Sequence, residues 1–257
     1  MPRKAREKSQ TGIYHVIIRG ANRQEIFHDD EDRLRFLDTI ERYKISVKTK
    51  MYGWCLMGNH VHLLLEEGSE ELSVTMKRIG VSYVSYYNSK YQATGHLFQD
   101  RFRSEKVEKD EYLLAVIRYI HQNPLKAGMV KRIEEWKWSS CPEYYGEKLY
   151  HHDLLDNKLI LKLFSDNNDL AKIMFKEFNE ATNEDACLED NKRIRLTDEE
   201  AVSEIKKLTP AIQIAQVKSF PKEKRNEAIN RLKGIEGVNH RQLARILGVS
   251  PNLVFKA

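Results

Sequence analysis

The chain has 257 residues, of which 41% are hydrophobic and 32% charged, a composition typical of a soluble globular protein. No segment approaches the roughly 18 consecutive apolar residues of a membrane span, and the basic N-terminus lacks the apolar core of a signal peptide. The three cysteines (Cys55, Cys141 and Cys187) are widely spaced and form no C-x-x-C pair. This pattern argues against a disulfide framework or structural zinc and predicts reduced thiols in a cytosol.

The net charge of +5 is unevenly distributed along the chain. Residues 1–150 sum to +4, residues 151–200 to −6 and residues 201–257 to +7. Two basic segments separated by an acidic one suggest two polyanion-facing modules and a spacer. We therefore predict a domain over residues 1–150, an acidic helical connector over 151–197 and a basic helical domain over 198–257.

The first elements alternate between strand and helix patterns. The β-branched run Ile13–Arg19 predicts a strand that ends at Gly20. An acidic run at 29–32 suits a helix N-terminus, and apolar residues at helical spacing follow it. Residues 51–57 predict a second strand, and Gly58-Asn59 forms a turn into a third strand, His60–Glu66.

The pattern continues with a helix over residues 71–89, a mixed aromatic and basic segment over 95–103 and a short strand over 104–107. Asp110 then caps a helix that runs from Glu111 to about Gln122 and is stopped by Pro124. This order of strands and helices is typical of an α+β fold, a ferredoxin-like sandwich with an antiparallel sheet.

The C-terminal part has an all-α pattern. Residues 153–191 are helical and acidic, and three further short helices are predicted over 199–207, 221–233 and 240–247. The last is followed by Gly248, and then by Ser250 and Pro251 at the cap and first position of another helix. A helix, a glycine turn and a capped second helix are the signature of a helix-turn-helix, whose second helix reads the major groove of DNA.

Two histidines on the third predicted strand suggest a metal site. His60 and His62 are separated by one residue, so their side chains project from the same face of the sheet. Two adjacent imidazoles can chelate a divalent metal if a third ligand comes from elsewhere in the fold. The alternative is a pair of surface or hydrogen-bonded strand histidines.

A tyrosine and an asparagine lie one turn apart on the helix before Pro124. Tyr119 and Asn123 are spaced i and i+4, so they share a helix face. A phenol there can attack phosphorus, a metal on a non-bridging oxygen makes that attack easier, and an amide carbonyl can be the third ligand. Tyr83, Tyr86 and Tyr87 on the preceding helix are competing candidates for the nucleophile.

Two motifs together resemble a known family. The segments Gly58-Asn59-His60-Val61-His62-Leu63-Leu64-Leu65 and Tyr119-Ile120-His121-Gln122-Asn123-Pro124-Leu125-Lys126-Ala127-Gly128 look like the REP-associated tyrosine transposases. These belong with the single-tyrosine insertion-sequence transposases of the HUH endonuclease superfamily. Residues 13–23 are similar to that family's opening strand and loop, and residues 95–102 to its Gln-x-Arg-Phe segment. The resemblance covers residues 10–145.

The resemblance implies a ferredoxin-like fold, a Mg²⁺ or Mn²⁺ site and cleavage of single-stranded DNA beside an imperfect hairpin, with a 5′-phosphotyrosine intermediate. By position, His60 and His62 would be metal ligands and Tyr119 the nucleophile. Asn123 stands where insertion-sequence relatives have a glutamine ligand, and its shorter side chain makes this the weakest assignment. The family also implies a cytoplasmic, nucleoid-associated prokaryotic protein that acts as a monomer or as a homodimer.

Further residues are candidates for contacts to DNA. They are basic or amide side chains near the predicted site, together with two arginines of the tail: Arg19, Asn22, Arg23, Gln99, Arg101, Arg103, Lys106, Arg241 and Arg245. Phe98 and Phe102 are candidates for stacking on unpaired bases. Solvated basic surface and core packing are the respective alternatives. The histidines without an assigned partner are interpreted as structural: His15, His28, His96, His151 and His152.

Three function classes follow from these features. The first is a metal-dependent enzyme that cleaves and rejoins single-stranded DNA. The second is a domesticated hairpin-binding protein with little or no cleavage activity. The third is a helix-turn-helix regulator whose N-terminal domain senses another ligand, for instance RNA. The intact set of His60, His62 and Tyr119 favours the first class over the second, and metal dependence separates the first from the third.

Overall fold

The computed structural model describes residues 7–148, 151, 153–185, 187–188, 196–209, 214–235 and 237–257. His152, one of the histidines interpreted as structural, lies outside these residues. The chain divides into two compact units, Met1–Glu189 and Asp190–Ala257. In the described ranges, no helix combines the length and the apolarity needed to cross a membrane. The predicted domain limits at residues 150 and 197 stay predictions.

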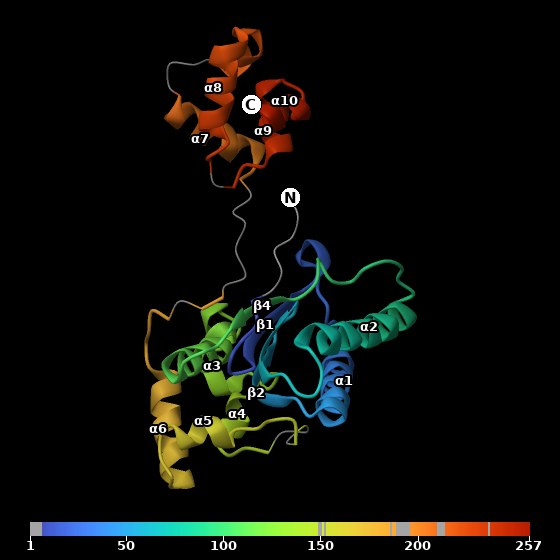
Figure 1. The fold of residues 1–257 in the computed structure, drawn as a ribbon, viewed down its shortest axis with the longest axis vertical. Helices are drawn as coiled ribbons and strands as arrows, with labels where there is room; N and C mark the ends of the chain where they lie inside the picture. Colours follow the sequence, from blue (N-terminus) through green and yellow to red (C-terminus); the bar gives the residue numbers. More distant parts are fainter. Residues whose placement is uncertain are drawn as a thin grey trace. The chain divides into compact units, whose positions relative to one another are not determined.

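The first unit contains a four-stranded antiparallel sheet (Figure 1). Its strands are β1 (Ile13–Arg19), β2 (Lys50–Leu56), β3 (His60–Glu66) and β4 (Arg103–Lys106), in the order β2-β3-β1-β4. Each neighbouring pair is antiparallel. The predicted mixture of helices with an antiparallel sheet is therefore confirmed.

One face of the sheet is covered by two long helices, α1 (Asp30–Val47) and α2 (Leu72–Tyr91), which lie together in Figure 1. Alternate strand residues such as Val16 and Leu63 point to this side and are fully buried. We call the resulting cluster the α1/α2 core. It is apolar, as expected for a sheet face that is shielded by two amphipathic helices.

The opposite face is covered by α3 (Asp110–Lys126), followed by the short helices η2 (Ile133–Glu135), α4 (Cys141–Tyr144), α5 (Lys158–Lys162) and α6 (Asn168–Glu180). Gly53 on β2 makes close packing possible, because a Cβ at that position would lie 2.1 Å from the side chain of Ile117 on α3. We call the cluster on this side the α3 core.

The predicted stop of α3 at Pro124 is wrong, because the helix continues to Lys126 with Pro124 inside it. A proline inside a helix removes its own N–H donor and crowds the carbonyl four residues earlier, but its fixed φ is helical. The turn after it closes through bonds from Ala127 N–H to the carbonyl of Asn123 and from Gly128 N–H to that of Leu125. A proline in the last turn of a helix is thus tolerated here.

The residues after α6 run along α3. Asp185 accepts hydrogen bonds from the guanidinium of Arg118 at 2.7 and 2.9 Å. Asn183 donates to the side chain of Gln122, which in turn donates to the carbonyl of Asn179. These hydrogen bonds attach residues 179–185 to the middle of α3.

The second unit consists of α7 (Asp198–Leu208), η3 (Ile214–Ser219), α8 (Lys222–Leu232), α9 (His240–Leu247) and α10 (Pro251–Lys256). These helices share a small apolar core. Between α9 and α10, Gly248 adopts a left-handed conformation with φ 64°, and the Ser250 side chain caps α10 by accepting from Leu253 N–H. The all-α pattern predicted for this part is present.

Asp32 in the first turn of α1 joins several elements of the α1/α2 core. Its side chain is fully buried and accepts from the backbone N–H of His28, the ammonium of Lys90 and the hydroxyls of Tyr86 and Tyr91, at 2.7 to 3.1 Å. We expect Asp32→Ala to lower the free energy of unfolding by about 2–4 kcal/mol, because it removes the buried acceptor that several part-buried donors share. Urea denaturation measures this.

Asp30→Ala is the matched control, because Asp30 lies in the same turn but is exposed and pairs with Lys137 at the surface. We expect it to cost less than about 1 kcal/mol. Equal losses in the two variants would contradict the role assigned to Asp32.

His121 on α3 makes a pH-dependent contribution to stability. It is fully buried between Ser140 and Asn179, and burial lowers the pKa of its imidazole from 6.5 to about 3. The unfolded chain therefore takes up a proton as the pH falls through 6.5, while the folded chain stays neutral until about 3. Unfolding becomes easier as the pH falls, by up to about 1.4 kcal/mol per pH unit from this residue.

We expect the slope of unfolding free energy against pH between about 6 and 4 to be smaller in His121→Gln, by roughly one proton. Urea titrations at several pH values measure it. An unchanged slope would contradict the assignment.

Candidate metal and tyrosine site

The antiparallel pairing of β1 with β3 places the two predicted ligand histidines on the α3 side of the sheet. In this register His60 lies opposite Arg19, and His62 lies opposite Ile17. The rings of His60 and His62 are 4.9 Å apart and nearly perpendicular. His62 is fully buried and His60 partly so. The predicted shared face is therefore present in the structure.

The hydrogen bonding of His60 leaves one ring nitrogen for a ligand. Its Nδ1 lies 2.6 Å from the side-chain oxygen of Asn59, whose amide nitrogen donates to the carbonyl of Arg23. Because the Asn59 oxygen can only accept, Nδ1 of His60 must carry the hydrogen. The lone pair of this neutral imidazole is then on Nε2.

His62 has a different partner, the histidine of the first strand. Its Nδ1 lies 3.1 Å from Nε2 of His15, and the two rings are stacked with centroids 5.4 Å apart. The Nε2 atom of His62 is buried and makes no hydrogen bond within the described part of the chain. A buried nitrogen without a protein partner fits a metal ligand, because metal coordination would satisfy it.

Burial keeps both imidazoles neutral at neutral pH. Burial first, and then the positive charge of Arg19, lower the pKa of His60 to about 4. Burial also lowers the pKa of His62 well below its usual range, followed by the effects of His15, His60 and Arg19. Neutral imidazole is the form that binds a metal ion, so this site requires no deprotonation near pH 7.

Tyr119 on α3 lies over the histidines. Its ring is 5.7 Å from the ring of His62 and 5.9 Å from that of His15, edge-on to both. The ammonium of Lys126 lies 5.5 Å from the Tyr119 ring on the same helix. Asn123, one turn on, donates from its amide nitrogen to the Tyr119 carbonyl at 2.8 Å, which leaves the amide oxygen as its ligand atom. The structure thus places Tyr119 against His62, whose ring neighbours that of His60.

The competing tyrosines of α2 lie in the α1/α2 core instead. Tyr83 is fully buried and its hydroxyl donates to the carbonyl of Ile26, while the Tyr87 hydroxyl bonds to His28. Tyr86 bonds to Asp32. The sheet separates these hydroxyls from the histidine pair, which favours Tyr119 among the four.

Three loops meet at the end of β1 beside His60. Gly20 N–H donates to the carbonyl of Asn59, Ala21 N–H to that of Leu97 and Gln99 N–H to that of Arg19. Asn22 and Arg23 are exposed in the short helix η1 (Ala21–Arg23), both in the left-handed conformation. Burial lowers the pKa of the Arg19 guanidinium, and the positive charges of Arg23 and Arg103 lower it further.

A groove of about 1030 Å³ lies between α2 and residues 95–102. Its lining is mainly apolar, with Phe98 and Phe102 on the loop side and Val81 and Val84 on the helix side. Gln99 and Arg101 also line it and are exposed. The groove therefore combines aromatic rings with a cation beside the His60 end of the sheet.

The remaining predicted DNA contacts lie elsewhere. Lys106 pairs with Glu7 at 3.0 Å. In the second unit, Arg245 pairs with Asp198 at 2.6 Å, whereas Arg241 is exposed on α9. The first two side chains thus have partners within the chain.

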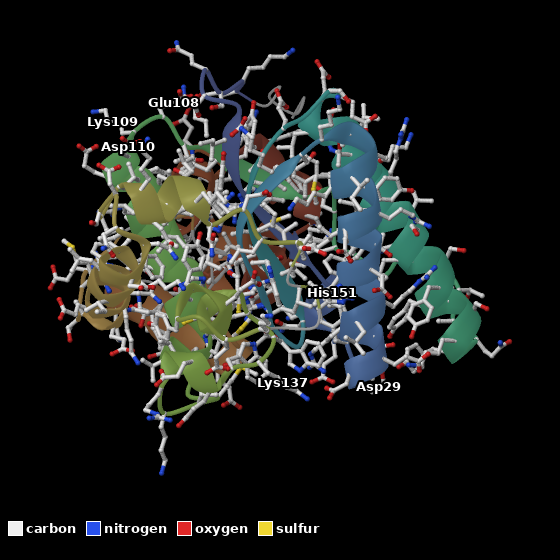
Figure 2. All side chains as sticks on the ribbon, turned by 90° about the horizontal axis from the view of Figure 1, so that it is seen from below. Asp29, Glu108, Lys109, Asp110, Lys137 and His151 are labelled. Atoms are coloured by element: carbon white, nitrogen blue, oxygen red, sulfur yellow. The ribbon has the colours of Figure 1, made fainter. Side chains whose placement is uncertain are left out.

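A second cluster of ligand-type side chains involves α1. Asp38 and Glu41 on this helix and His151 bring one ligand atom each within 4.8 Å of one another. Figure 2 shows His151 beside α1, and its Nδ1 lies 3.2 Å from the Glu41 carboxylate. His151 had no assigned partner in the sequence. Because α1 covers the α1/α2 core, this cluster is separate from the His60 and His62 pair.

His15 is the residue of the site that the sequence analysis missed. On β1 its side chain lies on the same face as those of Ile13 and Ile17, whereas Tyr14 and Val16 lie on the other face. This alternation predicts that His15 faces α3. Its diagonal contact with His62 could not be predicted, because it depends on the register between two strands far apart in the sequence.

Comparisons with known proteins agree with the motifs. The model of the family described as "Transposase IS200 like" matches residues 8–123. A protein of Haemophilus influenzae named as a REP-associated tyrosine transposase is 23% identical over 163 residues, which is 58% of this chain and 90% of that protein. The REP-associated tyrosine transposase of Escherichia coli K12 is 23% identical over 148 residues, covering 57% and 85%.

One solved structure is also similar, a REP-associated tyrosine transposase bound to a REP hairpin. It has a TM-score of 0.49 and 19% sequence identity, and the alignment covers 60% of this chain and 90% of that one. The matched region of the family model contains His60, His62, Tyr119 and Asn123. The resemblance expected from the sequence is confirmed: residues 8–123 match the IS200-like transposase family.

Proposed function

We propose that the first unit is a metal-dependent enzyme that cleaves single-stranded DNA beside a hairpin and rejoins strands through a 5′-phosphotyrosine. The observation on which this depends is the contact of Tyr119 with the ring of His62, which neighbours His60 and whose buried Nε2 has no hydrogen-bond partner among the described residues. The family match at residues 8–123 supports the same activity. The strand order β2-β3-β1-β4 supports the ferredoxin-like arrangement expected for this family.

The donor atoms fit a divalent metal with borderline ligand preference. His60 and His62 would hold it through Nε2, and Asn123 through its amide oxygen. Mn²⁺ accepts imidazole more readily than Mg²⁺, which prefers oxygen, so Mn²⁺ is the better probe. When bound, the metal would neutralise charge on a non-bridging phosphate oxygen and make the phosphorus more electrophilic.

The residues of the chain would perform the remaining steps. Tyr119 would attack the phosphorus, so that an O–P bond forms to the phenol oxygen while the bond to the 3′ oxygen breaks. The phenol loses its proton and the departing 3′ oxygen gains one. Reversal of the same step with another 3′ hydroxyl would rejoin strands. Arg19 lies opposite His60 on the neighbouring strand. Its guanidinium would hold the phosphate beside the tyrosine.

DNA binding would use the loops beside the site. Arg23 and Arg103 extend the positive charge of Arg19, and the groove beside α2 offers Phe98 and Phe102 for stacking on unpaired bases. We propose Gln99 and Arg101 as its polar contacts. Together these residues would bind hairpin DNA.

The second unit would add a further contact to DNA through its helix-turn-helix, α9 and α10. The left-handed Gly248 and the capped start of α10 support this interpretation. Arg245 and Gln242 both bond to Asp198 and so pack α9 against α7. Arg241 is therefore a better candidate than Arg245 for a contact to a partner.

The first test is a cleavage assay on single-stranded hairpin oligonucleotides from the DNA that flanks this gene. With Mn²⁺ we expect a covalent protein–DNA adduct on a denaturing gel, and we expect it to vanish with EDTA and in Tyr119→Phe. Tyr87→Phe is the matched control and should keep the adduct, because its hydroxyl bonds to His28, away from the histidine pair.

An adduct that survives Tyr119→Phe and disappears in Tyr87→Phe would move the nucleophile to α2. Tight hairpin binding without an adduct under any metal condition would leave a binding protein, the second function class.

The groove makes a separate prediction about salt dependence. We expect Arg101→Ala to weaken binding of single-stranded DNA and to reduce the slope of log affinity against log salt by roughly 0.7, the value for one lost phosphate contact. Fluorescence anisotropy at several salt concentrations measures both. Lys162→Ala is the control, because Lys162 is exposed on α5 outside the groove. Equal slopes for wild type and Arg101→Ala would refute this contact.

A further inference from the structure

We propose that His15 is a positioning residue, which holds His62 in the tautomer that leaves Nε2 available for a metal ion. This inference rests on the proposed metal site and adds a residue to it. The contact is direct, since Nε2 of His15 lies 3.1 Å from Nδ1 of His62. Both side chains are fully buried, so no solvent competes for this hydrogen bond.

The two nitrogens can share only one hydrogen. If His15 donates, His62 accepts at Nδ1 and must carry its own hydrogen on Nε2, where it blocks a metal. If His62 donates from Nδ1, its Nε2 has a lone pair and His15 carries a hydrogen on Nδ1. Only the second arrangement gives a metal ligand.

His15 is better placed to orient a ligand than to be one. Within the described residues, no set of ligand atoms from His15, His60 and His62 lies within 4.8 Å of one another, whereas Asp38, Glu41 and His151 meet that distance. Nε2 of His15 contacts Nδ1 of His62 and not the Nε2 atom that would bind the ion. A hydrogen-bond acceptor behind a ligand histidine fixes both its tautomer and its ring orientation.

Asn59 sets the tautomer of His60 in the same way. Asn59 accepts from Nδ1 of His60 at 2.6 Å and leaves Nε2 of that ring with the lone pair. His15 thus does for His62 what Asn59 does for His60. The two acceptors come from different elements, the first strand and the turn before β3, yet both leave Nε2 as the ligand atom.

His15 also contacts the candidate nucleophile. Its ring is 5.9 Å from the Tyr119 ring in an edge-on arrangement. Loss of the His15 side chain would open space under Tyr119 as well as behind His62, so DNA cleavage alone cannot separate the two effects. Binding of metal in the absence of DNA can separate them.

The experiment compares three substitutions at this position. In His15→Gln, the amide ends where Nε2 of the imidazole lies and can accept from His62. In His15→Asn, the amide is one bond too short to reach, and His15→Leu removes the acceptor. His121→Gln is the control for altering a buried histidine, because His121 bonds to Ser140 and Asn179 and not to the pair.

Mn²⁺ affinity is measured on metal-free protein without DNA, from the electron paramagnetic resonance signal of free Mn²⁺. We expect His15→Leu and His15→Asn to weaken binding about 10- to 100-fold, and His15→Gln and His121→Gln to change it by less than about threefold. Wild-type affinity in His15→Leu, or equal losses in the Gln and Asn variants, would overturn the inference.

The tautomer is measured separately, by long-range ¹H–¹⁵N correlation spectra of the metal-free protein. We expect the hydrogen of His62 on Nδ1 in the wild type and in His15→Gln, and on Nε2 in His15→Leu. A wild-type His62 with its hydrogen on Nε2 would overturn the inference. If the wild type binds no Mn²⁺, the proposed metal site fails, and these spectra still decide whether His15 sets the tautomer.

Discussion

The register between β1 and β3 is the constraint on which this structure depends. It places Arg19 opposite His60 and Ile17 opposite His62, and so brings His15 diagonally against His62. A slip of one residue would turn every side chain of a strand to the other face. If β3 slipped, Val61 and Leu63 would leave the α1/α2 core, and His60 and His62 would enter it. The apolar face therefore fixes the geometry of the polar one.

The parts of the site that follow from local periodicity could be predicted from the sequence. The spacing of His60 and His62 gives a shared strand face, and that of Tyr119 and Asn123 gives a shared helix face; the structure has both. The order of strands and helices was also predictable from the local pattern of each element, although the predicted cap at Asp110 is wrong, because α3 begins at Asp110 and its N-cap Lys109 makes no side-chain cap bond. These predictions depend only on residues that lie within one helical turn, or within two positions on a strand.

The remaining features depend on contacts between distant segments. The contact of His15 with His62 spans 47 residues and requires the strand register. The choice between Tyr119 and the tyrosines of α2 requires knowing that α2 and α3 cover opposite faces of the sheet. Net charge likewise does not show which segments pack together. The acidic charge after residue 150 suggests a spacer, yet Asp185 pairs with Arg118 on α3 and residues of α6 pack in the α3 core.

The charges around the histidine pair explain how metal and DNA would depend on each other. In the described part of the chain, no third histidine, cysteine or acidic side chain joins His60 and His62 as a ligand. The proposed ligands are thus neutral nitrogens and an amide oxygen, beside the cations of Arg19 and Lys126. A divalent ion there would have no protein counter-charge, so a phosphate would supply both the charge and the missing oxygen ligands. Metal and DNA would then bind with positive coupling, each raising the affinity of the other.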